Sequence, residues 1–159
     1  MTLKRGLIAV GILLAMAGLV LGVDYLRRIR PADLAPGSVP IYVGDRLIGA
    51  FVPADLEGLD QASFVDAEEG KTQEGWLLRD IMPQHISPDA LRPETVIVVS
   101  STSRDKSAQI TWEQADDPEN GVLFDLSSRG TLKLVSKLEG LDTRDTWVQD
   151  VDKIEVVIR

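Results

Sequence analysis

The sequence predicts an α+β protein, in which one N-terminal transmembrane helix is followed by a small, mixed, β-rich domain with short helices. Three observations lead to this fold class. Residues 6–23 read GLIAVGILLAMAGLVLGV and carry no charge. Beyond about residue 39, glycines and prolines divide the chain into short apolar segments, several of them alternating apolar and polar residues. Residues 94–101 (ETVIVVSS) are rich in β-branched side chains, which favour strands. At 159 residues the chain has room for one domain.

The uncharged segment has the length of a membrane span. A helix rises about 1.5 Å per residue, so these 18 residues cover about 27 Å. A buried core helix would keep a polar stripe, and this segment has none. The poor small-x-small match at residues 20–22 favours a retained anchor over a cleaved signal peptide. We therefore expect an n-region at 1–5, a transmembrane helix or signal anchor at 6–26, a Pro-rich tether at 27–38 and a globular domain at 39–159.

Basic residues flank the apolar segment on both sides and leave its orientation open. Lys4 and Arg5 precede it, and Arg27, Arg28 and Arg30 follow it. The positive-inside rule slightly favours a cytoplasmic domain. The short N-terminus and signal-like layout are typical of exported bacterial domains. We expect a single-pass protein of the cell membrane with an extracytoplasmic domain, and a cytoplasmic domain is the alternative.

The rest of the chain is strongly acidic. Residues 31–159 contain 12 basic and 24 acidic side chains, a net charge of -12, whereas the whole chain has -8. Such a domain repels nucleic acid, so we expect no nucleic-acid partner. The chain has no cysteine, which excludes disulfides, thiolate metal sites and cysteine nucleophiles.

The first half of the domain predicts a hairpin and two short helices. Residues 41–52 (IYVGDRLIGAFV) form two apolar runs around Gly-Asp, a dipeptide suited to a tight turn. A proline begins and a glycine closes the short helix expected at 53–59. A strand at 62–65 and a charged loop at 66–74 come next. Residues 75–82 (GWLLRDIM) place three apolar side chains on one helical face before Pro83, which predicts a core-facing helix.

The second half predicts strands. The β-branched run at 94–101 indicates a central strand buried on both faces. Alternation at 107–112 predicts its neighbour, and GVLFDL at 121–126 predicts a further short strand. A turn at Arg129-Gly130 separates that strand from one at 132–135. Apolar alternation between residues 147 and 158 predicts the closing strand.

This order of elements, with two motifs, resembles the molybdopterin-binding domain of the sulfite oxidase type over roughly residues 39–158. The first motif is G-x-x-L-x-D followed by two apolar residues, and it is matched by Gly75, Leu78, Asp80, Ile81 and Met82. The second is a tryptophan-led terminal strand, and it is matched by Trp147, Val148, Val151, Ile154 and Val156. The resemblance implies that fold, and it implies an oxidoreductase-like domain that binds a molybdopterin. The resemblance does not extend to the catalytic residues. The catalytic members use a cysteine as molybdenum ligand and bind the anionic pterin through basic and histidine side chains, whereas this chain has no cysteine, one histidine and an acidic domain. We therefore expect no cofactor, and molybdopterin is the alternative.

Three residues are candidates for a ligand site. Ser101, Arg104 and Lys106 follow the expected central strand, and loops at strand ends often hold binding sites for small anions. A polar hairpin turn is the alternative. His85 has no second histidine to complete a metal or catalytic site, which favours a position on a loop surface.

Other conspicuous side chains favour structural roles. The acidic residues at 116–119 lack the regular alternation of a calcium loop and indicate a solvated turn. Trp76, Trp112 and Trp147 occupy apolar positions of expected elements and are expected in the core. No catalytic constellation and no metal site is expected.

Two functions follow from these patterns. The first is a membrane-anchored, non-catalytic interaction or accessory domain, a subunit or partner of a membrane complex or transporter, held at the membrane through residues 6–26. The second is a small oxidoreductase-like domain that binds a molybdopterin or another small ligand.

Overall fold

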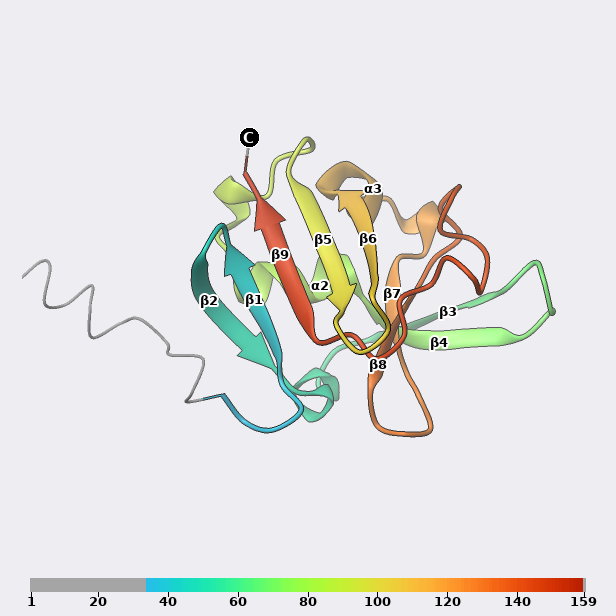
Figure 1. Ribbon diagram of the computed structural model, residues 1–159. Coiled ribbons are helices and arrows are strands. Elements are labelled where there is room, and N and C mark those ends of the chain that lie inside the picture. Colours follow the sequence, from blue (N-terminus) through green and yellow to red (C-terminus); the bar gives the residue numbers. More distant parts are fainter. Residues whose placement is uncertain (1–33, 159) are drawn as a thin grey trace, which may run out of the picture. The chain divides into compact units, whose positions relative to one another are not determined.

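Two β-sheets and a few short helices make up residues 34–158, the part of the chain that the computed structural model describes (Figure 1). This arrangement confirms the mixed, β-rich α+β class. The expected n-region and transmembrane helix, and the tether up to residue 33, lie outside the described residues. Within residues 34–158, no helix is long and apolar enough to span a membrane.

The first sheet has five strands in the order β2-β1-β9-β5-β6. The strands are β1 (Val39–Val43), β2 (Arg46–Phe51), β5 (Val96–Ser101), β6 (Lys106–Thr111) and β9 (Lys153–Val157). Neighbouring strands are antiparallel except β1 and β9, which are parallel. The C-terminal strand therefore lies in the middle of the sheet, and β2 and β6 are its edges.

The second sheet has four strands in the order β3-β4-β7-β8. They are β3 (Gln61–Val65), β4 (Thr72–Leu77), β7 (Leu123–Leu126) and β8 (Leu132–Val135), all antiparallel. The outer edge of β8 is covered by the segment before β9. Leu134 and Val148 exchange two main-chain hydrogen bonds of 2.8 and 3.3 Å, and Val151 N donates to Leu132 O at 2.9 Å. This edge is therefore closed to other chains.

The helices within residues 34–158 are all short. They are η2 (Pro53–Leu56), α2 (Leu78–Ile81), η3 (Met82–Gln84), η4 (Pro88–Ala90), α3 (Trp112–Asp116) and η5 (Pro118–Asn120). A capping box starts α3 directly at the end of β6. Gln114 N donates to Thr111 Oγ1 at 3.3 Å, and Thr111 N donates to Gln114 Oε1 at 2.9 Å. The strand therefore ends at Thr111, one residue before the predicted boundary.

Buried apolar side chains from both sheets and α2 form the main core, which includes Ile97, Val99 and Phe124. Trp76 belongs to this core, and Trp147 lies in a second cluster with Leu123 and Val135. Both tryptophans are buried as predicted, whereas Trp112 at the start of α3 is only half-buried.

The predictions for residues 66–82 were wrong in part. The expected loop ends early and the expected helix starts late, because Thr72–Leu77 form strand β4 and only Leu78–Ile81 are α-helical. The reason lies in a contact between strands: a Cβ on Gly75 would stand 1.9 Å from Phe124 O. Only glycine allows β4 to approach β7 so closely. The helical spacing of the apolar residues at 75–82 could not reveal this contact between strands.

Two further strand predictions need correction. β5 lies inside its sheet as predicted, but it is not buried on both faces. Ile97, Val99 and Ser101 are buried, whereas Val96, Val98 and Ser100 are only half-buried. The closing strand begins at Lys153 rather than Trp147, because the residues before it cover β8 instead. The β1–β2 hairpin, with Gly44 at φ +56°, and strand β8 are confirmed.

Candidate binding groove

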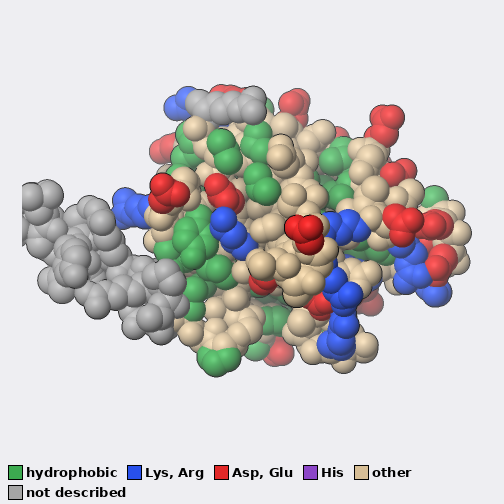
Figure 2. Space-filling model, in the orientation of Figure 1, with side chains coloured by type: hydrophobic (Ala, Val, Ile, Leu, Met, Phe, Trp, Pro, Cys, Tyr) green, Lys and Arg blue, Asp and Glu red, His purple; other side chains and the backbone are tan. Residues whose placement is uncertain are grey.

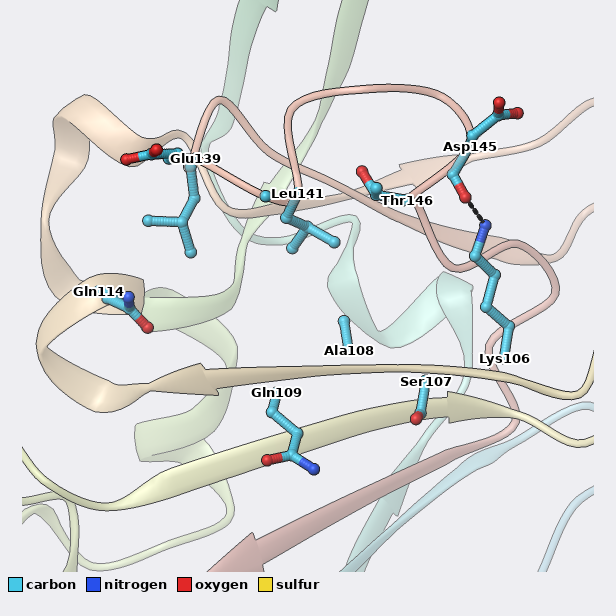
Figure 3. A pocket seen from close by; sticks show the side chains of 11 residues that line it. Lys106, Ser107, Ala108, Gln109, Gln114, Glu139, Leu141, Asp145 and Thr146 are labelled. Atoms are coloured by element: carbon cyan, nitrogen blue, oxygen red, sulfur yellow. Dashed lines mark hydrogen bonds between the residues drawn. The ribbon is translucent and has the colours of Figure 1, made fainter.

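A groove of about 460 Å³ runs between strand β6 and the segment formed by residues 138–146 (Figure 3). One wall is β6, from Lys106 to Gln109, and the other includes Leu138, Glu139 and Leu141. Gln114 of α3 also lines the groove. We call this hollow the β6 groove.

Strand β6 is an edge strand, and its register shows which main-chain groups face outward. Trp112 N donates to Thr95 O at 2.7 Å, which continues the β5–β6 register by one pair. In an antiparallel ladder hydrogen-bonded pairs alternate with non-bonded pairs. Ala108 and Ile110 therefore bond to β5, and the N–H and C=O groups of Ser107 and Gln109 point away from it. Within residues 34–158 these four groups bond to no loop and to no side chain.

Two hydrogen bonds hold the segment opposite β6 in place. The ammonium of Lys106 donates a hydrogen bond to the carbonyl of Asp145, which Figure 3 draws as a dashed line. Trp147 Nε1 donates to Leu141 O at 3.1 Å, so a buried indole fixes the middle of the segment. These contacts keep a space between the segment and β6.

Arg144 ties the same segment to the turn of the β3–β4 hairpin. Its main-chain N–H donates to Glu68 Oε2 at 3.0 Å, and its guanidinium pairs with the Glu69 carboxylate. Hydrogen bonds from Lys71 and from Arg144 hold the pKa of Glu69 below its usual value. The groove wall is therefore anchored by an ion pair that exists only while the Glu69 carboxylate is charged.

Charge in the groove is mainly negative. Glu139 and Asp145 contribute carboxylates, and Lys106 contributes the one ammonium among the residues that line it. Figure 2 shows acidic and basic side chains interspersed on the face that it displays, without a basic patch. The groove is therefore better suited to a basic ligand than to an anion.

The structure brings two of the three residues predicted as a ligand site, Ser101 and Lys106, to one hollow and sets Arg104 apart. Ser101 is 1% exposed, and its Oγ lies 3.3 Å from Ser103 Oγ. Arg104 Nε donates to Asp150 Oδ2 at 2.7 Å. A hollow of about 320 Å³ beside the 102–105 turn is lined by Ser101 and Lys106 but not by Arg104. The proposed anion site at these residues stays a prediction.

Asp150 forms a cluster that sequence reasoning did not find. Its carboxylate accepts hydrogen bonds from Thr131 Oγ1 at 2.7 Å and from Arg129 Nη2 at 3.0 and 3.1 Å, besides the one from Arg104. The Thr131 hydroxyl and then the Arg104 guanidinium hold the pKa of Asp150 below its usual value. Asp150 has φ +54°, a conformation that aspartate tolerates better than most residues. The cluster joins three loops that lie far apart in the sequence.

The prediction that His85 lies on a loop surface was wrong. It follows η3, is half-buried, and stacks on Phe51 with ring centroids 5.7 Å apart. Burial lowers the pKa of His85, and the charge of Asp55 acts in the opposite direction. Its surroundings are those of a packing residue.

The acidic turn at 116–119 is tied into the domain by its main chain. Arg79 Nη1 donates to Asp116 O at 3.0 Å, and Asp117 Oδ1 accepts from Glu119 N at 2.9 Å. Within the described residues, no three His, Cys, Asp or Glu side chains are grouped so that they could hold a metal ion.

Comparisons of the chain with protein-family models, with curated proteins and with solved structures gave no match. The assignment of a function therefore rests on the residues and on the β6 groove.

Proposed function

We propose that this chain is a membrane-anchored, non-catalytic interaction domain, an accessory subunit or partner of a membrane complex or transporter, and that it contacts its partner through the β6 groove. The observation that carries the proposal is the free main-chain edge at Ser107 and Gln109, lying inside a groove of about 460 Å³. An exposed strand edge is a template for pairing with another chain.

The sequence supports the membrane part of the proposal. Residues 6–26 supply the anchor, and the tether at 27–38 reaches about 40 Å when extended. The net charge of -12 over residues 31–159 keeps the domain away from anionic lipid headgroups. Both features present the domain to a neighbouring protein rather than to the lipid surface.

The alternative is a small oxidoreductase-like domain that binds a molybdopterin or another small ligand, and the family resemblance supports it. In this structure the matched residues have packing roles: Gly75 allows the contact with Phe124, and Trp147 is buried. Arg104, a candidate for binding an anion, is paired with Asp150, as is the neighbouring basic side chain of Arg129. The groove supports the interaction role more strongly.

Photo-crosslinking tests the proposal. A photoreactive benzoyl-phenylalanine replaces Glu139 in the groove wall of the full-length protein, and the charge-matched control carries it at Glu57, which is also exposed but lies after η2. In native membranes we expect a discrete adduct from position 139 and none from position 57. Equal labelling, or no adduct at 139, would refute the assignment of the groove.

A second measurement tests the alternative function. The full-length protein purified in mild detergent should contain no molybdenum by elemental analysis and no pterin fluorescence. Stoichiometric metal or pterin would replace the interaction role with the oxidoreductase-like one.

A further inference from the structure

The β6 groove also indicates what kind of partner segment it holds, an inference that rests on the proposed function. We infer that the partner enters the groove as an extended peptide that adds a strand to β6, with basic side chains beside Glu139 and Asp145.

The main chain of β6 provides the pairing surface. Ser107 and Gln109 each present one N–H and one C=O group, and strand geometry spaces them about 7 Å apart. Two residues of an extended peptide, separated by one residue, match that spacing and form four hydrogen bonds. Strand addition to a free edge is a known mode of peptide recognition, in which main-chain bonds give affinity and side-chain pockets give specificity.

The neighbouring edges provide a comparison. The outer edge of β8 is closed by Leu134, Val148 and Val151. The β3 edge presents outward groups at Ser63 and Val65, because Asp66 N donates to Lys71 O and sets the register. That strand belongs to a hairpin that extends from the body of the domain (Figure 1), whereas β6 faces a second wall. The wall at 138–146 gives β6 the side-chain contacts that a bare edge lacks.

The groove wall selects the peptide's side chains. In Figure 3, Ala108 points from β6 toward the wall that carries Leu141, and both side chains are buried. The side chains of Ser107 and Gln109 are exposed on the other face of the sheet. Alternate side chains of an added strand therefore face the apolar wall.

Charge complementarity acts on the same wall-facing positions. The carboxylates of Glu139 and Asp145 flank the groove, while the Lys106 ammonium is occupied by the Asp145 carbonyl. A lysine or arginine in the peptide finds opposite charge there, and a glutamate meets like charge. The preferred peptide therefore places basic residues at its wall-facing positions, where their aliphatic stems lie along the apolar wall and their charges lie beside Glu139 and Asp145.

Fluorescence anisotropy with defined peptides tests this inference. The probe is a fluorescein-labelled hexapeptide of alternating lysine and valine, added to the full-length protein in mild detergent. We expect it to bind at least 10-fold more tightly than the glutamate–valine hexapeptide. A lysine–valine peptide N-methylated at its valines keeps the charge and loses the N–H groups that face β6, and it should also bind at least 10-fold more weakly.

Protein variants locate the binding to β6. Gln109→Pro removes an N–H that the β5–β6 ladder does not use, so the fold should persist while affinity falls at least 10-fold. Ser63→Pro, at the β3 edge, is the matched control and should bind normally. Glu139→Lys, on the groove wall, leaves β6 untouched and should reverse the preference between the two peptides.

Several outcomes would overturn the inference. Equal binding of the N-methylated peptide would show charge attraction without strand addition, and unchanged affinity in folded Gln109→Pro would place the peptide elsewhere. A concentration-dependent dimer abolished by Gln109→Pro would assign the edge to a second copy of this chain. If the peptides fail while crosslinking at position 139 still gives its adduct, only the strand-addition inference is wrong.

Discussion

Replacement of Gly75 by alanine tests whether the close contact of β4 with β7 organises the second sheet. The added Cβ would lie 1.9 Å from Phe124 O, 2.6 Å from Phe124 C and 3.0 Å from Asp125 Cα. These are main-chain atoms in a ladder, so no side-chain rotation relieves the clash. The strands must separate by about 1.5 Å to restore an ordinary contact distance, which lies near the optimum of about 3.5 Å for non-bonded heavy atoms.

The cost follows from the contacts that this separation breaks. Trp76 pairs with Phe124 in the ladder, and Leu78 N donates to Val122 O at 3.0 Å. Two or three hydrogen bonds at about 0.5–1.5 kcal/mol each, with the packing of two buried aromatic rings, give a loss of about 3 kcal/mol or more. That is a large part of the free energy of unfolding of a small domain.

Urea unfolding of the full-length protein in mild detergent, followed by tryptophan fluorescence, measures this loss. Gly58→Ala is the control, because its Cβ has no neighbour within 4 Å, and we expect a change of about 0.5 kcal/mol or less. A Gly75→Ala protein as stable as the Gly58→Ala control would refute the packing argument.

Substitutions at three other sites test the burial of β5, the Asp150 cluster and the packing of His85. Val99→Asp places a charge at a fully buried position and should prevent folding. Val98 is half-buried beside Glu155, so Val98→Asp should lower the free energy of unfolding in urea by only about 1 kcal/mol. Equal costs would contradict the one-sided burial of β5. Asp150→Asn keeps the positive φ but loses the charge, and should lower the free energy of unfolding by about 1–2 kcal/mol at pH 7. Because the folded-state pKa of Asp150 is lowered, its contribution is present above about pH 4 and is lost as the pH falls through the folded-state value, so the two proteins should become equally stable there. His85 has a lowered pKa, so stability should fall as the pH drops below about 6.5, and His85→Gln should remove that slope in urea titrations at pH 7 and 5.5.

Sequence patterns predicted the elements whose signals are local. The β1–β2 hairpin follows from a turn dipeptide between two apolar runs, and β8 from a short apolar run after a glycine turn. Strand β4 could not be predicted in this way, because its conformation depends on the approach of Gly75 to a strand almost 50 residues away. The one-sided burial of β5 was also hidden, because valine occupies both of its faces.

The β6 groove illustrates the same limit. Lys106 was a candidate from its place after a strand, but Ser107 and Gln109 were not, because they contribute main-chain groups that have no residue signature. Whether those groups are free depends on which strand lies at the edge of the sheet, and the strand order places the C-terminal strand between β1 and β5. The Asp150 cluster likewise depends on loops brought together by the whole fold.

Amide hydrogen exchange at β6 tests the central claim most directly. In the free full-length protein the N–H groups of Ser107 and Gln109 should exchange rapidly, while those of Ala108 and Ile110, bonded to β5, should be protected. Addition of the lysine–valine hexapeptide should protect Ser107 and Gln109 selectively. Protection of all four amides in the free protein, or no change at Ser107 and Gln109 with saturating peptide, would contradict the account.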